Sequence, residues 1–257
     1  MRSFVSSFLI LSAAALLVAA TVYGEAGSRR GVDSAALVPL KEAKLIIEHN
    51  ATDKDTGFQG FIDSEGWQRI DVRGPGGPVL TFEGRGSLAK LGLTELFFET
   101  VEPENADVPI DEMLAKLPAG TYTFAGSTQE NGKRSGRTLG VARFTHVIPA
   151  GPKLVSPAEG ATVPVRGVVA RWQPVTKTIS GTPVTIIAYQ LIIEKDVERP
   201  PAHMIGTFGL SMYLPRSVTR IAVPNGFLEP RTVYKWEVLA IERSGNQTLS
   251  SGSFRTL

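Results

Sequence analysis

The sequence predicts an all-β protein made of two consecutive β-sandwich domains that follow an N-terminal signal helix. Apolar and polar residues alternate with a period of two over most of residues 41–257, as in strands with one buried face. Gly, Pro and Asn interrupt this alternation at short intervals and mark turns. After the signal segment, the pattern becomes helical in one place, between Pro109 and Pro118, so we expect one short helix in the first domain.

Residues 1–24 are interpreted as a secretory signal peptide. Arg2 precedes an apolar stretch from Phe8 to Ala20, and Val22 and Gly24 fit the small-residue rule before a cleavage point. The alternative is an uncleaved membrane anchor, because Phe4–Tyr23 has about the 20 residues that cross a bilayer. Both interpretations predict export to the periplasm, the cell surface or the medium.

The composition limits the type of organism the protein comes from and the kinds of site it can form. An exported chain with no cysteine relies on packing alone, which favours a bacterial envelope protein over a disulfide-stapled animal domain. The same absence excludes thiolate metal sites and cysteine nucleophiles. Residues 25–150 hold 18 Asp and Glu against 14 Lys and Arg, and residues 151–257 hold 7 against 12. Neither half carries a basic run of the kind that binds nucleic acid.

Two boundaries divide the chain. Residues 25–40 lack periodicity and are expected to form a flexible tether. Residues 149–152 (Pro-Ala-Gly-Pro) are expected to form a short, semi-rigid joint, because two prolines restrict the backbone. A β-sandwich-like domain at 41–148, whose family we do not recognise, and a second domain at 153–257 follow from these boundaries.

The first domain is expected to contain seven strands and one helix. Pro109 suits the first turn of that helix, Asp111 and Glu112 favour its positive end, and Pro118 ends it. A turn is expected at 64–66. The expected strands are 43–49, 57–63, 67–73, 79–83, 93–101, 121–125 and 138–147.

The second domain resembles a fibronectin type III domain. Leu228-Glu-Pro230 followed by Tyr234-Lys-Trp236 is similar to the corner and sixth strand of that family, and residues 168–174, with Trp172, to its second strand. The expected strands are 154–156, 167–172, 185–194, 204–208, 217–223, 233–242 and 249–256. The resemblance implies an immunoglobulin-like β-sandwich that acts as a spacer or binds partners.

Side-chain alternation predicts the core of the second domain. Trp172, Trp236 and Ile187 each lie on a strand face whose alternate residues are apolar, so we expect all three inside the sandwich. The hydroxyl of Tyr234 should reach the backbone near Leu228 and form a tyrosine corner. The first domain has a fainter echo of this corner, in which Tyr122 follows Leu117 by five positions.

No constellation in the sequence indicates catalysis. Gly84-Arg-Gly86 follows a strand, but Gly92 leaves no room for the long helix of a dinucleotide site. Glu95 and Glu99 lie about 13 Å apart on one strand, too far for a glycosidase pair. Glu99, Glu102 and Glu104 therefore look like a solvated acidic edge, and His49, His146 and His203 are isolated. We expect no catalytic residue and no cofactor site.

One loop carries a candidate cation site. Asp53 and Asp55, with Asn50 or Asp63, offer the hard oxygen ligands that calcium prefers, in a loop that ends at Gly57. The spacing is not that of an EF-hand. The competing interpretation is an Asx-type turn between two strands.

Three functions remain open at this stage. The favoured one is a non-catalytic binding, adhesion or scaffold protein, whose partner is a protein or a glycan outside the cytoplasm. The second is a structural subunit that self-associates. The third is a glycan-directed enzyme with its site in the first domain. Nucleic acid is not an expected partner, and a membrane is one only if the signal segment stays uncleaved.

Overall fold

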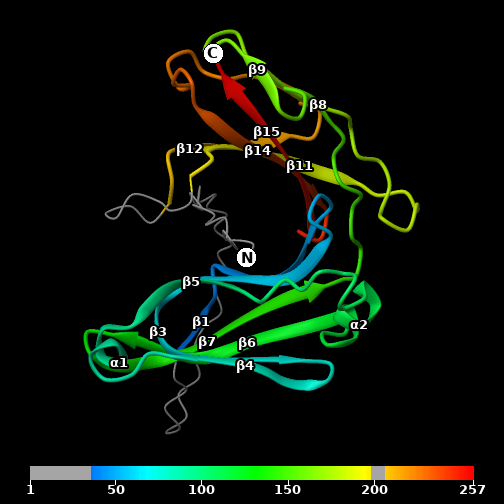
Figure 1. Ribbon diagram of the computed structural model, residues 1–257. Coiled ribbons are helices and arrows are strands. Elements are labelled where there is room, and N and C mark those ends of the chain that lie inside the picture. Colours follow the sequence, from blue (N-terminus) through cyan, green and yellow to red (C-terminus); the bar gives the residue numbers. More distant parts are fainter. Residues whose placement is uncertain (1–35, 198–205) are drawn as a thin grey trace, which may run out of the picture.

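The computed structural model describes residues 36–197 and 206–257, and within these ranges the protein is all-β with two short helices (Figure 1). The predicted fold class is therefore confirmed. The predicted signal segment at 1–24, His203 and the first residues of the strand expected at 204–208 lie outside the described residues. Within those ranges, no helix combines the length and the hydropathy that crossing a bilayer requires.

The first domain is built from seven strands and two helices. The strands are β1 (Ala36–Pro39), β2 (Glu42–Asn50), β3 (Asp55–Gly74), β4 (Gly77–Glu83), β5 (Leu93–Glu99), β6 (Gly120–Glu130) and β7 (Lys133–Phe144). The helices are α1 (Ser87–Leu91) and α2 (Ile110–Ala115). The predicted helix corresponds to α2, whereas α1 was not predicted as a helix.

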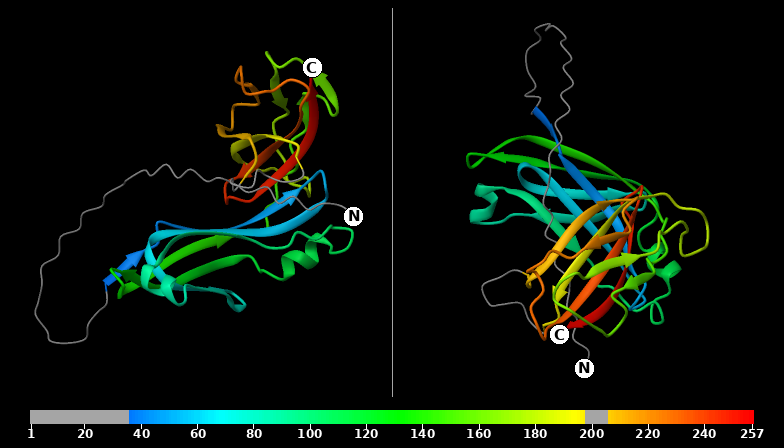
Figure 2. Two further views of the ribbon diagram at one scale, coloured as in Figure 1. Left: turned by 60° about the vertical axis from the view of Figure 1, so that its left-hand side comes forward. Right: turned by 90° about the horizontal axis from the view of Figure 1, so that it is seen from above.

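Strand β3 connects the two layers of the first domain. Its first half pairs with β2 and β5, and its second half pairs with β4 and β6, which continues into β7 and β1. The sheet thus curls over one apolar core, in which the largest side chains are Trp67, Tyr122, Phe124 and Phe144. Figure 2 shows these layers from two further directions.

Two details of this domain differ from the sequence prediction. The expected turn at 64–66 is a bend inside one continuous strand, and the pairing register shifts there. Gly66 is needed at the bend, because a Cβ at this position would lie 2.4 Å from the carbonyl oxygen of Gln129. Residues 36–39, which we expected in the tether, form β1 and pair in parallel with β7.

The second domain is a sandwich of two sheets. One sheet has three strands, in the order β13 (Arg220–Ala222), β10 (Val169–Trp172) and β8 (Leu154–Ser156). The other runs β12 (Gly209–Pro215), β11 (Ile186–Lys195), β14 (Val233–Glu242) and β15 (Gln247–Thr256). The short β9 (Ala161–Val163) adds to β15 in parallel. Between the sheets lies a second apolar core that contains Trp172, Tyr189, Tyr234 and Trp236.

Both tyrosine corners are present. The backbone N–H of Glu229 donates to the hydroxyl of Tyr234 at 2.8 Å, as the sequence predicts. In the first domain the hydroxyl of Tyr122 donates to the carbonyl oxygen of Pro118 at 2.7 Å. Ile187 is the exception among the predicted core residues: a bulge in β11 turns Ile186 inward and leaves Ile187 48% exposed.

The sheets of the two domains are continuous at one edge. Strand β15 pairs in parallel with β2, with Gln247 opposite Glu48 and Leu249 opposite Asn50. The two domains therefore meet at β2 and β15 and diverge from there (Figures 1 and 2). The joint at 149–152 lies beside this seam and is itself fixed, since the N–H of Ala150 donates to the carbonyl of Lys177 at 2.9 Å.

Candidate functional site

A groove of about 820 Å³ lies at the junction of the two domains. Its walls come from the first halves of β2 and β3, from β5, the end of β7, strands β11 and β12, and the turn between β14 and β15. Phe61, Phe97 and Tyr213 give the groove an aromatic lining, and Ile46 and Ile187 add aliphatic surface. The cationic side chains at the groove are Lys44, Arg143 and Arg243.

Side-chain hydrogen bonds hold the walls of the groove together. Asn246, at the start of the last strand, accepts from the N–H of Ile47 at 2.9 Å and donates to the carbonyl of Val147 at 2.8 Å. The hydroxyl of Thr248 donates to the carbonyl of Pro149 at 2.6 Å. Asn246 and Thr248 are both fully buried, so these bonds are shielded from water. The walls of the groove are therefore held in place by bonds within the protein itself.

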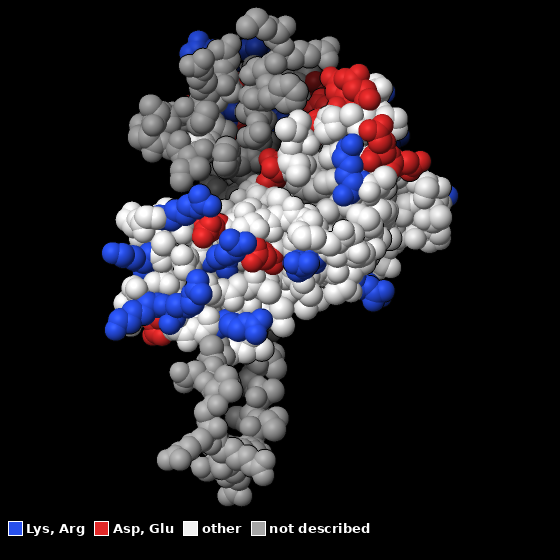
Figure 3. Space-filling view, turned by 90° about the horizontal axis from the view of Figure 1, so that it is seen from below, with Lys and Arg blue, Asp and Glu red and all other residues white. Residues whose placement is uncertain are grey.

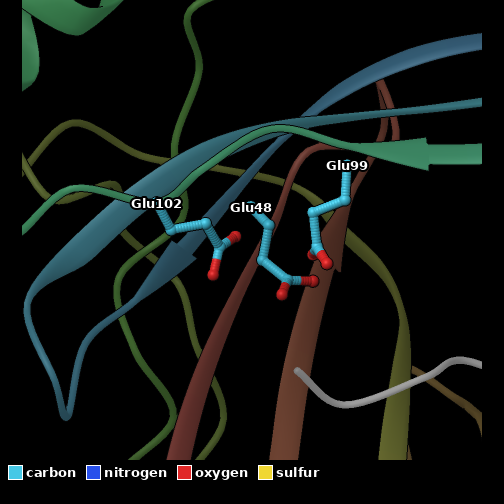
Figure 4. Close-up of side chains that lie close together, drawn as sticks. All are labelled: Glu48, Glu99 and Glu102. Atoms are coloured by element: carbon cyan, nitrogen blue, oxygen red, sulfur yellow. The ribbon is translucent and has the colours of Figure 1, made fainter. Parts of the chain in front are cut away.

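Three carboxylates meet beside the groove and form the carboxylate trio, defined as Glu48, Glu99 and Glu102 (Figure 4). One oxygen from each lies within 4.8 Å of the others. Glu48 comes from β2 and Glu99 from the end of β5, and the strand between them is β3. The trio therefore owes its proximity to strand pairing between residues far apart in the sequence. None of the three lines the groove itself.

Two glutamine amides bridge the trio to the second domain. The amide nitrogen of Gln247 donates to Glu48 and also to the side-chain oxygen of Gln59, at 3.2 Å to the latter. Gln59 in turn donates to Glu99 at 2.7 Å. All four groups lie on the same side of the shared sheet, so the chain of bonds crosses from β5 to β15.

The surroundings of the trio favour protonated carboxyl groups. Burial raises the pKa of Glu48 to about 7, and the charges on Glu99 and Glu237 act in the same direction. Burial also raises the pKa of Glu102 to about 8, helped by its neighbours Glu48 and Glu99. Both shifts favour the protonated form, because adjacent negative charges in a partly dry site repel one another.

Glu102 is held close to the backbone of β3. A Cβ on Gly57 would lie 2.6 Å from the Cγ of Glu102, so only glycine at position 57 permits this approach. The Oε1 atom of Glu102 is buried and has no hydrogen-bond partner among the described residues. In chemical terms the trio supplies hard oxygen donors, but a calcium ion takes six to eight of them.

The calcium candidates at the neighbouring hairpin are arranged as a turn. The side-chain oxygen of Asn50 accepts the N–H groups of Thr52 and Asp53, both at 3.0 Å, and its amide donates to Asp53 at 2.9 Å. This is the Asx-type pattern. Asp63 lies on β3 about 26 Å from Asp55 at roughly 3.3 Å per residue, so it cannot close the loop around an ion.

Asp55 is less exposed than the sequence suggested. One of its carboxylate oxygens is buried without a partner among the described residues, and burial together with the charge on Asp53 raises its pKa to about 6. Asp53 itself is exposed. The two side chains therefore differ in environment, and the structure gives them no shared bond.

The described histidines occupy separate structural positions. The ring of His49 bonds to the carbonyl of Asp55 at 3.0 Å and to the hydroxyl of Thr56 at 2.9 Å. The ring of His146 bonds to the carbonyl of Leu117 at 2.8 Å. Neither ring takes part in an acidic metal cluster within residues 36–197 and 206–257.

Sequence reasoning missed the trio because it assigned Glu99 and Glu102 to a solvated edge. Glu48 offered no local signal either, since it alternates regularly with Ile46 and Lys44 on one strand face. Only the pairing of β2 with β3, and of β3 with β5, brings these carboxylates together.

Comparisons with known proteins gave structural similarity only. No protein-family model and no curated protein matches the chain. A two-domain fibronectin type III segment of chicken tenascin is 12% identical, with a TM-score of 0.29, over 84% of this chain and 99% of that one. The FN1–FN3 domains of chicken CNTN1 are 11% identical, with a TM-score of 0.29, over 83% of this chain and 63% of that one.

A third structure is a tetra-tandem repeat from the extending region of a large adhesion protein. It is 11% identical, with a TM-score of 0.29, over 84% of this chain and 50% of that one. The decisive observations for the fold come from the chain itself, namely the three-stranded sheet facing the four-stranded one and the corner at Tyr234. The second domain has a fibronectin type III-like fold.

Proposed function

We propose that the chain is an exported, non-catalytic binding or scaffold protein that presents the groove at its domain junction to a partner protein or glycan. The observation that carries this proposal is the groove itself, which is lined by aromatic and aliphatic side chains and lies between two domains joined by one sheet. Binding sites are commonly concave, largely apolar and preformed, and they occur preferentially where domains meet.

The pairing of β2 with β15 supports a role in binding, because it already holds the two domains together. A partner therefore loses less binding free energy to ordering them. Ordering a loose pair of domains would cost affinity, whereas bonds such as Asn246 to Ile47 already fix the walls. Tyr213 and Ile187 remain 52% and 48% exposed at the groove, so a partner would bury them. Aromatic anchors of this kind dominate the energetics of many interfaces.

Export is part of the proposal and rests on the sequence of residues 1–24. A positively charged start, an apolar stretch and small residues ahead of Glu25 are typical of a cleaved secretory signal. The absence of cysteine favours a bacterial envelope or the surrounding medium. The mature protein from its native host should begin at Glu25 or within about two residues of it.

A pair of isoleucines in the second domain allows a matched test of the groove. Ile187 lines the groove, whereas Ile179 is 43% exposed elsewhere on the same domain. A photo-crosslinking residue placed at either position in the full chain, in the native host, would report the neighbours of each surface. We expect a defined partner to crosslink at position 187 and not at 179.

The isolated partner then permits a quantitative test. Ile187→Asp should weaken its binding about tenfold or more, because it buries a charge at a contact. Ile179→Asp should leave the affinity unchanged, and circular dichroism would confirm that both variants are folded. Equal labelling at the two positions, equal affinities, or recovery of intact Met1 in a soluble cytosolic fraction would each contradict the proposal.

A further inference from the structure

The outer face of the second layer of the first domain carries regularly placed arginines. Strand pairing sets Arg69 of β3, Ser127 of β6 and Arg137 of β7 side by side, and Arg73, Thr123 and Val141 form a parallel row. Arg143 lies beyond these rows, opposite Thr121. All these side chains share one face, because their positions along each strand differ by even numbers. We call this surface the arginine face, defined by Arg69, Arg73, Arg137 and Arg143.

The negative charge beside the arginine face is concentrated on β3 and β4, where Glu83 lies opposite Arg69. Asp71 forms a two-bond pair with Arg69, at 2.7 and 3.0 Å. Within residues 36–197 and 206–257, the structure shows no ion pair to Arg73, Arg137 or Arg143, and all three are exposed. Figure 3 looks onto the underside of the first domain, where blue side chains gather with a smaller number of red ones among them.

The side chains between the arginines on β6 are small, and none of them is aromatic. The outward residues of β6, the middle strand, are small: Thr121, Thr123, Ala125 and Ser127. On β7 the outward Leu139 and Val141 are 40% and 59% exposed. A linear chain could lie along these small side chains and reach the guanidinium groups on both sides.

The area that the four arginines enclose is small compared with a protein interface. From β3 to β7 the face measures about 10 Å, and from Arg137 to Arg143 about 20 Å, at ordinary strand spacings. Even with side-chain margins the area is on the order of 400 Å², about half of the 800 Å² that each partner buries in a stable protein complex. A thin polymer suits these dimensions better.

We propose that the arginine face binds an anionic polysaccharide, one that carries carboxylate or sulfate groups along its chain. Guanidinium groups match both anions because their planar fork donates two parallel hydrogen bonds. The polymer would lie along β6 and β7, with its anions alternating between the arginines on either side. Arg143 also lines the groove, so the arginine face borders the groove at the end of β7.

The outward positions of β3, β6 and β7 favour a glycan over a membrane. Segments that lie in a bilayer interface combine basic residues with aromatic side chains that insert among the lipids. The arginine face has no aromatic residue on these three strands and no lysine between Arg69 and Arg73 or between Arg137 and Arg143.

A triple substitution with a charge-matched control tests this proposal. The test variant is Arg73→Gln/Arg137→Gln/Arg143→Gln, and the control is Arg166→Gln/Arg171→Gln/Arg220→Gln, which removes three exposed arginines from the second domain. Binding of the full chain to dextran sulfate and to polygalacturonate would be measured, with neutral dextran as the blank. Circular dichroism would establish that both variants are folded.

We expect the test variant to lose about tenfold or more of its affinity for both anionic polymers, because each exposed ion pair contributes a modest, additive amount. The control should change by less than about twofold, and wild-type binding should weaken as salt rises. Equal losses in both variants would show that net charge alone acts and would overturn the proposal. No wild-type binding to either polymer, or stronger binding to phosphatidylglycerol vesicles or a DNA duplex, would also overturn it.

Discussion

Asn246 and Val147 are joined by a buried hydrogen bond that ties the last strand of the second domain to the end of the first. The amide nitrogen of Asn246 donates to the carbonyl of Val147 at 2.8 Å, and the oxygen of the same amide accepts from Ile47 at 2.9 Å. One side chain therefore satisfies two backbone groups that β2 and the 145–149 segment leave unpaired. This explains why a residue in a β-turn sequence is only 1% exposed.

Asn246→Ala should uncouple the two domains. The change leaves the N–H of Ile47 and the carbonyl of Val147 buried without partners, which should cost about 3 kcal/mol or more of unfolding free energy. In urea, fluorescence and circular dichroism should follow a single transition in the wild type and separate in the variant. Asn246→Asp is the matched control for the donor. Its carboxylate can still accept from the N–H of Ile47, but it has no N–H to donate to the carbonyl of Val147 and repels that oxygen. If both variants unfold like the wild type, the seam does not depend on this amide.

The same bonds make Asn246 unsuited to glycosylation. The sequence Asn246-Gln-Thr248 has the acceptor pattern, but its amide nitrogen is buried and engaged by Val147 and by the backbone and hydroxyl of Thr145. The acceptor pattern usually indicates an exposed loop, but here its asparagine lies in the buried contact between the two domains.

The carboxylate trio should make the protein less stable as pH rises. Glu48 and Glu102 have ordinary values of 4.5, and the folded state raises their pKa values to about 7 and about 8. The folded state therefore binds more protons than the unfolded state, so their contribution is complete at low pH and is lost as pH rises through those values. For the buried Glu48 the loss amounts to at most about 3 kcal/mol.

The measurement is thermal unfolding between about pH 6.5 and 9. Burial lowers the pKa of His49, which acts in the opposite direction below its ordinary value of 6.5, so this window isolates the carboxyl groups. Glu102→Gln should flatten the decline in Tm, whereas Glu112→Gln, on the exposed face of α2, should leave it unchanged. A Glu102→Gln profile parallel to that of the wild type would mean that Glu102 is ionised in the folded state at all these pH values.

Gly57→Ala tests the contact between Glu102 and β3. The added methyl would lie 2.6 Å from the Cγ of Glu102 and must displace that side chain toward water. We therefore expect Gly57→Ala to reproduce the flatter pH profile of Glu102→Gln, at a cost of about 1–3 kcal/mol from overpacking. Gly76→Ala, where nothing lies within 4 Å, is the control substitution. If Gly57→Ala keeps the wild-type pH profile, Glu102 does not depend on this approach.

The sequence predicts the sandwich of the second domain well because its signals are local. Tyr234, Trp236 and Trp172 occupy the core as expected, since strict alternation over strands of ordinary length determines which face is buried. Ile187 fails for a physical reason: one extra residue in β11 inverts the alternation at that point, and such a bulge depends on the partner strand. In the described part of the strand expected at 204–208, residues 206–208 are not in a strand, and β12 begins at Gly209.

The first domain and its trio depend on pairing that no local pattern reveals. A glycine at position 66 is compatible with a hairpin turn and with a bend inside a strand. Here the close approach of the Gln129 backbone, on the neighbouring strand, accompanies the bend. Glu48 and Glu99 meet because both neighbour β3, although about half of the first domain separates them in the chain. Contacts between residues so distant in sequence are properties of the topology.

Calcium binding at Asp53 and Asp55 remains a prediction that stability can test. The side chain of Asn50 already bonds to Asp53 and to the turn, so we expect millimolar calcium, compared with chelator, to leave Tm unchanged. If calcium did bind, a calcium concentration of a hundred times Kd would add about 2.7 kcal/mol to the free energy of unfolding. A shift that Asp53→Asn/Asp55→Asn abolishes would establish the loop as a site. A shift that persists there but disappears in Glu99→Gln/Glu102→Gln would place the ion at the carboxylate trio.

Residues 153–257 should fold without the first domain. Among the described residues, the core cluster of this segment is built from its own side chains, including Trp172, which is 2% exposed and packs edge-on against Tyr189 at 5.5 Å between ring centroids. Trp172→Ala should cost about 3–5 kcal/mol as a large core truncation. Ile187→Ala removes an exposed side chain and should stay within about 0.5 kcal/mol of the wild type. Circular dichroism and urea unfolding of the segment provide both values, and an unfolded segment beside a folded full chain would show that the boundary at 149–152 is wrong.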